Sequence, residues 1–159
     1  MGTTFVRGVA LTLLVGGSVL AQTHPDLSGT WTNDPSKSDP APAAATGRGR
    51  GALLPPNQIV IRQTPTDVSV QRGAQTITYN FDGTETFAFI RGEVRATAAW
   101  EGEKFVVSWK KDFYAGPKEG YVTSSGKDVY SVAGSVLTEE STTVAPTGTT
   151  VTKTVFTRN

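Results

Sequence analysis

The chain of 159 residues contains no cysteine and only one histidine. The absence of cysteine excludes disulfides, thiolate catalysis and a cysteine-anchored lipoprotein. A lone histidine, His24, is too little for a Ser-His-Asp triad or for a zinc site of the usual kind. We therefore predict no catalytic residue, no metal site and no cofactor.

An excess of charge of one sign is also lacking, because 15 basic residues face 14 acidic ones. A balanced domain has no electrostatic attraction for nucleic acid or for an anionic membrane. Two carboxylate pairs are expected in solvent. Glu101 and Glu103 sit at an exposed hairpin, and Glu139 and Glu140 cannot converge because neighbouring strand residues point to opposite faces. By the same alternation Arg72 and Arg95 are placed on polar faces, in solvent.

Long apolar runs are missing except at the N-terminus. Arg7 precedes an apolar stretch at 8–20 that contains three glycines, and Val19-Leu20-Ala21 precedes Gln22. A basic residue, a short apolar run and small residues in this order are typical of a secretory signal peptide, whereas a membrane span needs a longer run. We predict a signal peptide at residues 1–21 and one exported domain at 22–159, periplasmic or secreted, with no stable membrane insertion after cleavage.

Residues 34–56 are rich in residues that interrupt regular structure. They include five prolines and a Gly-Arg-Gly-Arg-Gly run at 47–51. Proline and glycine at this density oppose both a helix and a central strand. Two arginines are too few for a basic nucleic-acid-binding tract. The segment is predicted to be an irregular loop.

From residue 57 onward, apolar and polar residues alternate between turn signals spaced about ten residues apart, as in a β-meander. Ile77, Tyr79 and Phe81 share one face of the run 76–81. Asp82-Gly83 follows this run and is a strong hairpin signal; Ser125-Gly126 is a further turn candidate. The mature chain is predicted to be an all-β, antiparallel up-and-down barrel of about 8–10 strands, because closure removes exposed edges. A two-sheet sandwich is the alternative.

Aromatic residues on the apolar strand faces are the candidates for a ligand-binding interior. In a barrel of this size, such side chains either pack the core or line a cavity for one small ligand. Sequence alone does not separate the two. The candidates are Tyr79, Phe81, Phe87, Phe89, Phe105 and Trp109.

Four short motifs resemble sequences of lipocalin-like (calycin) barrels, most closely those of small secreted bacterial lipocalin-like domains. They are Leu27-Ser28-Gly29-Thr30-Trp31, Asp34-Pro35-Ser36-Lys37-Ser38, Trp100-Glu101-Gly102-Glu103-Lys104 and Thr154-Val155-Phe156-Thr157-Arg158. The resemblance implies that Trp31 plugs one end of the barrel and that the Arg158 guanidinium lies across its indole. Such a cation–π stack is worth about 0.5–2 kcal/mol. It would join the first and last strands as a structural pair.

These observations lead to an expected function and its alternatives. The first is a non-enzymatic exported barrel that binds a small hydrophobic ligand in its interior. The second is a packed barrel without a cavity that acts as an extracytoplasmic interaction or accessory domain, with an unknown protein partner. The third, an enzyme that uses Tyr, Arg or carboxylates, is weakened by the absence of a second histidine and of a convergent carboxylate pair.

Overall fold

Ten antiparallel strands make up the regular structure of the computed structural model, which describes residues 24–40, 57–89 and 92–159. The predicted signal peptide and residues 41–56 of the predicted loop lie outside these ranges. Among the described residues no helix is long and apolar enough to cross a membrane. The strands are β1 (Gly29–Asn33), β2 (Gln58–Gln63), β3 (Asp67–Arg72), β4 (Gln75–Asn80), β5 (Thr86–Phe89), β6 (Glu93–Glu101), β7 (Lys104–Gly116), β8 (Gly120–Ala133), β9 (Val136–Ala145) and β10 (Gly148–Arg158).

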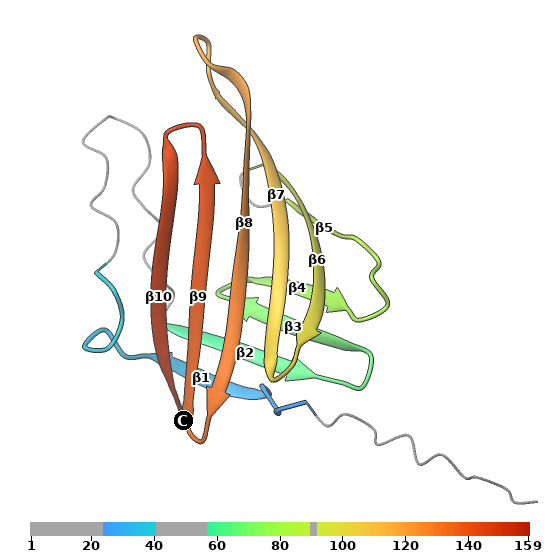
Figure 1. Ribbon diagram of the computed structural model, residues 1–159, viewed down its shortest axis with the longest axis vertical. Helices are drawn as coiled ribbons and strands as arrows, with labels where there is room; N and C mark the ends of the chain where they lie inside the picture. The colour runs from blue at the N-terminus through green and yellow to red at the C-terminus, as the bar shows by residue number, and fades with distance from the viewer. Residues whose placement is uncertain (1–23, 41–56, 90–91) are drawn as a thin grey trace, which may run out of the picture.

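All ten strands belong to one sheet with the order β4-β3-β2-β1-β10-β9-β8-β7-β6-β5. Most strands pair with the next strand in the chain, and β1 pairs with β10, which joins the two ends of the sequence. The sheet coils so that β1–β4 run across behind the upright strands β6–β10 (Figure 1). The prediction of an all-β, up-and-down barrel is confirmed, and the barrel is nearly closed.

One predicted turn is wrong, and its position explains why a glycine is needed there. Gly126 lies inside β8, directly opposite Trp109 on β7. A Cβ atom on Gly126 would overlap the Trp109 indole and the carbonyl oxygen of Thr142. The glycine therefore makes room for an aromatic ring against the sheet, which is the usual meaning of glycine within a strand.

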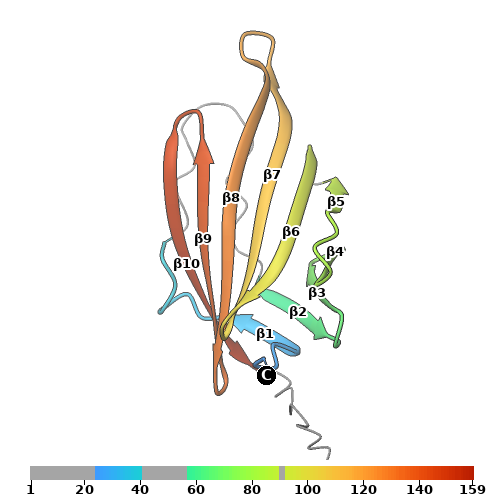
Figure 2. The same ribbon diagram turned by 45° about the vertical axis from the view of Figure 1, so that its right-hand side comes forward.

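The hairpin of β7 and β8 is much longer than the strands at the start of the chain. These two strands have 13 and 14 residues, whereas β1–β4 have five or six. The hairpin extends beyond the tip of β9 and β10 (Figure 2). We call its projecting part, residues 112–123, the arm.

The apolar core fills the end of the barrel opposite the arm. Phe105 is fully buried at its centre, with its ring centroid 5.4 Å from that of Trp100 and 6.0 Å from those of Phe81 and Tyr130. The fully buried side chains are Leu27, Trp31, Ile59, Ile61, Val68, Val107, Phe105, Leu137 and Phe156. The chain thus buries its largest apolar groups at one end.

The first residues of the predicted loop, 34–39, lie along the edge of β10. The Asp34 N–H donates to the Val155 carbonyl oxygen at 2.8 Å, and the Asp39 N–H donates to the Lys153 carbonyl oxygen at 2.8 Å. The Ser38 hydroxyl oxygen accepts the Val155 N–H at 2.9 Å. This part of the loop is irregular, yet it continues the hydrogen bonding of β10 where β1 ends.

Candidate functional site

The junction between β1 and β10 closes one end of the barrel. Trp31 and Arg158 are paired across the two strands, and the Arg158 Cζ atom lies 4.5 Å from the Trp31 ring centroid. The Trp31 indole N–H donates to the Leu27 carbonyl oxygen at 3.0 Å. The indole is fully buried, so this pair has the geometry of a structural plug and leaves no open site at this end.

The junction between β4 and β5 is open. Gly83 adopts a φ of 81° in the turn between them, but the two strands form no ladder in the sheet. The expected hairpin at Asp82-Gly83 is therefore wrong in its pairing, although the turn itself forms. The reason is that β4 runs across the barrel while β5 follows β6 (Figure 1). In the described part of the chain, one hydrogen bond joins the two strands, from the Thr86 hydroxyl to the Thr78 carbonyl oxygen at 2.8 Å.

An interior cavity of about 350 Å³ lies against this open junction. One side of it is formed by small and apolar side chains of β4, β5 and β6, namely Ile77, Ala88, Val94 and Ala96. The other side is formed by polar side chains of β3, β8 and β9, namely Arg72, Asp128, Tyr130, Glu139 and Ser141. The cavity therefore has an apolar wall and a polar wall.

Three residues of the polar wall form a hydrogen-bonded group that we call the polar cluster: Arg72, Tyr130 and Glu139. Arg72 Nη2 donates to the Tyr130 hydroxyl at 2.9 Å and to Glu139 Oε1 at 2.5 Å. The Tyr130 hydroxyl in turn donates to the same carboxylate oxygen at 3.0 Å. Burial opposes the charge of Arg72, but Tyr130 and Glu139 outweigh it and raise the pKa of the guanidinium. Arg72 and Glu139 therefore form a charge-assisted ion pair inside the barrel.

Burial raises the pKa values of other polar groups beside the polar cluster. Burial raises the pKa of Asp128, and hydrogen bonds from Ser141 and Trp109 oppose this shift only in part. The Ser141 hydroxyl donates to Asp128 Oδ1 at 2.5 Å. Burial also raises the pKa of Tyr79 to about 12 and that of Tyr130 well above its usual range. Both phenols are therefore hydrogen-bond donors at neutral pH.

Four of the six aromatic candidates lie inside the barrel. Tyr79 and Trp109 line the cavity, whereas Phe81 and Phe105 pack within the core below it. The aromatic interior predicted from the sequence thus combines two roles, since part of it lines the cavity and part of it fills space.

Phe87 and Phe89 do not lie on the interior face, which corrects their expected placement. Their side chains are 63% and 79% exposed on the outside of β5. Pairing with β6 sets Thr86 opposite Ala96 and Ala88 opposite Val94. Because side chains alternate along a strand, this register turns the two phenylalanines outward.

Sequence reasoning missed the polar wall, although a signal for it was present. Arg72 has the same parity as Val68 and Val70, which point into the core, and Glu139 has the same parity as the buried Leu137. Both were expected in solvent, but only 8% of Glu139 is exposed. A charged residue at an inward position of a strand was the informative feature.

The remaining candidates for chemistry do not assemble into a site. The His24 ring stacks on the Trp100 indole with centroids 4.5 Å apart. Glu101 forms an exposed ion pair with Lys127 at 3.1 Å. No group of three or more His, Cys, Asp or Glu side chains that could hold a metal ion occurs among the residues that the structure describes.

No protein-family model, curated protein or solved structure matches this chain. The cavity itself is therefore the basis on which a function is argued.

Proposed function

We propose that this chain is an exported, non-enzymatic, lipocalin-like barrel that binds one small, largely hydrophobic molecule in its interior. The observation that carries the proposal is the cavity of about 350 Å³ with one apolar and one polar wall. Cavities of this size lie at the lower end of the range that takes up small ligands. A packed barrel without a cavity, the alternative from sequence, is disfavoured by this space.

The apolar wall supplies the affinity. A ligand that buries about 200 Å² of apolar surface against Ile77, Ala88 and Val94 gains about 5 kcal/mol before the cost of immobilising it. The Trp109 indole also lines the cavity. Because Trp31 and Trp100 emit as well, the part of the tryptophan fluorescence that is lost in Trp109→Phe reports occupancy.

The polar wall selects the other end of the ligand. The cavity as a whole is lined by two basic side chains, Arg72 and Lys111, and by two acidic ones, Asp128 and Glu139. A charged ligand group would lose its water without gaining a net countercharge, which is costly in a buried site. A hydroxyl or amide can instead exchange hydrogen bonds with Ser141 or Tyr130. We infer that the ligand ends in an uncharged hydrogen-bonding group.

The lipocalin-like assignment rests on the way the barrel is closed. Trp31 and Arg158 join the first and last strands at one end, while the cavity lies beside the unpaired strands of the other junction. One closed end and an accessible interior are what a ligand carrier of this class requires. Export rests on the predicted signal peptide.

Native mass spectrometry of the chain as its host exports it is the first test. A discrete additional mass that disappears on denaturation supports a resident ligand and identifies its class. Dodecanol and dodecanoate, two ligands with the same apolar body, then test the polar wall through Trp109 fluorescence. We expect the alcohol to bind more tightly than the carboxylate.

A matched pair of variants separates the cavity from the outer surface. Ala88→Phe fills the cavity, because Ala88 lines it from β5. Ala99→Phe adds the same ring on the exposed outer face of β6. We expect Ala88→Phe to abolish dodecanol binding and Ala99→Phe to leave it unchanged. Equal binding by both variants would refute an interior site.

A further inference from the structure

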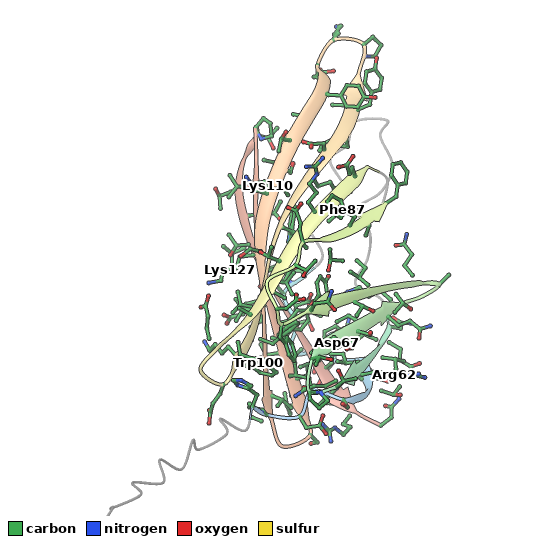
Figure 3. All side chains as sticks on the ribbon, turned by 90° about the vertical axis from the view of Figure 1, so that its right-hand side faces the viewer. Arg62, Asp67, Phe87, Trp100, Lys110 and Lys127 are labelled. Carbon is green, nitrogen blue, oxygen red and sulfur yellow. The ribbon has the colours of Figure 1, made fainter. Side chains whose placement is uncertain are left out.

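The exposed aromatic side chains of the described residues gather at the end of the barrel that is opposite the Trp31 plug. They belong to β5 and to the arm, and Figure 3 shows Phe87 above the level of Trp100 and Asp67. Tyr121, at 83%, is the most exposed of them. The four residues are Phe87, Phe89, Tyr114 and Tyr121. Clustered exposed apolar groups of this kind mark interaction sites rather than ordinary protein surface.

A large open hollow lies between these two groups of aromatic side chains. Phe89 lines it from β5, and Tyr114 and Tyr121 line it from the arm, around a volume of about 1040 Å³. The Tyr114 and Tyr121 rings contact each other edge to face, with centroids 5.6 Å apart. Lys111 lines both this hollow and the interior cavity. The end of the barrel that carries these four exposed aromatic residues, which we call the aromatic end, therefore borders the opening of the interior cavity.

Among the described residues of this end, charged groups of both signs lie near the aromatic side chains. Arg95 and Glu93 form an ion pair at 2.6 Å on the outside of β6. Lys118 and Glu119 follow one another in the exposed turn of the arm. This balance offers no field that would attract an anionic or a cationic partner.

We propose that the arm and β5 dock this protein on a zwitterionic lipid surface, with the hollow facing the bilayer. Tyrosine has an apolar ring and a polar hydroxyl, and it is enriched at the boundary between lipid and water for that reason. The aromatic side chains of β5 and those of the arm lie on opposite sides of the open hollow and do not form one continuous groove. A lipid surface laid across the hollow would therefore contact both groups at once. The balanced charge fits neutral headgroups.

Docking of this kind does not depend on the interior ligand. It explains why the exposed aromatic groups stay uncovered in the chain alone. Peripheral attachment through side chains also differs from insertion of a membrane span. Ala99→Phe, on the outer face of β6, leaves both the arm and β5 intact and should therefore leave docking unchanged.

The absence of cysteine allows a clean positional test. A single introduced thiol is the sole labelling site, because the chain contains no other. Ala115→Cys places an environment-sensitive fluorophore in the arm, beside the hollow. Ser135→Cys places the same fluorophore in the exposed turn between β8 and β9, at the opposite end of the barrel. Phosphatidylcholine vesicles should shift the emission of the label at position 115 toward the blue and leave that at position 135 unchanged.

Side-chain substitutions then test which groups make the contact. The double variant Tyr114→Ser/Tyr121→Ser should weaken the partition into phosphatidylcholine vesicles at least tenfold, because each buried aromatic ring is worth about a factor of ten. Lys118→Gln, a change of charge in the same turn, should leave the partition unchanged. Both variants lie in the exposed arm, and circular dichroism checks that the barrel remains folded.

Several outcomes would overturn the proposal. Equal shifts of both labels would indicate non-specific adsorption, and no shift of either would exclude docking on this lipid. Binding that requires anionic lipid and disappears at high salt would be electrostatic and not aromatic. An unchanged partition of the folded double tyrosine variant would show that the arm is not the docking element.

Discussion

The two junctions of the barrel contrast in how they are held together. β1 and β10 stand at opposite ends of the chain, yet they pair through backbone hydrogen bonds and through the Trp31–Arg158 stack. β4 and β5 are separated only by a short turn with a favourable Asp-Gly pair, yet they form no ladder. At these two junctions, therefore, nearness in sequence does not decide which strands pair. The barrel is joined where buried apolar groups meet and left open where the cavity lies.

The polar cluster compensates in part for the open junction. Arg72 comes from β3, whereas Tyr130 and Glu139 come from β8 and β9 on the other side of the interior. Their hydrogen bonds connect β3 to the long strands through the barrel. β3, the neighbour of the edge strand β4, is thus held to the opposite side of the barrel by hydrogen bonds through the interior.

Removal of the Trp31 indole should have the largest effect on stability. Trp31→Ala leaves a cavity in the fully buried plug and removes the partner of Arg158, so we expect a loss of about 3–5 kcal/mol in the free energy of unfolding. Urea denaturation followed by circular dichroism measures it. Arg158→Gln, which removes only the stack, should cost about 1 kcal/mol. Equal losses for the two variants would show that the indole is not the main element of this junction.

Disruption of the polar cluster should have an intermediate effect. Glu139→Gln removes the negative charge that Arg72 faces and should cost about 2 kcal/mol, the scale of a charge-assisted hydrogen bond in a half-buried site. The adjacent Glu140→Gln, exposed on the outer face of β9, is the control and should stay within about 0.5 kcal/mol of the parent chain. A neutral result for Glu139→Gln would mean that the cluster does not hold β3 to the long strands.

The carboxyl of Asp128 should make stability depend on pH in an unusual direction. Its pKa is raised by burial in the folded chain, so its stabilising contribution is present at low pH and is lost as the pH rises through the folded-state pKa. Asp128→Asn should therefore be more stable than the parent chain at neutral pH, and the difference should shrink under acidic conditions. Asp112→Asn, a change at an exposed carboxyl in the arm, is the comparison variant, and denaturation curves across this range measure both.

Loss of the single hydrogen bond at the open junction should have the smallest global effect. Thr86→Val removes the donor to the Thr78 carbonyl oxygen and should cost about 0.5–1 kcal/mol. Amide hydrogen exchange should nevertheless rise in β4 and β5 while it stays unchanged in β1 and β10. Thr97→Val, on the exposed outer face of β6, serves as the control. Uniformly faster exchange would contradict a local opening at this junction.

Alternation along the chain was sufficient to predict which side chains of β4 face the interior. Tyr79 and Phe81 were placed correctly, because β4 has one apolar and one polar face. The same rule failed for Phe87 and Phe89, since β5 is short and its orientation is set by pairing with the small residues of β6. It also failed at Gly126, where a turn signal in fact accommodates the Trp109 ring.

Period-two alternation and frequent turn residues were enough to predict an all-β antiparallel fold, because such strands bury their apolar faces in a sheet. A short motif at each end of the chain also indicated the Trp31–Arg158 pair. The sequence pattern did not reveal which junction stays open, where the cavity lies or that Arg72 faces Glu139. These features depend on the coiling of the sheet, which brings β3 opposite β8 and β9. Contacts across the interior of a barrel join residues far apart in the chain, and no local pattern specifies them.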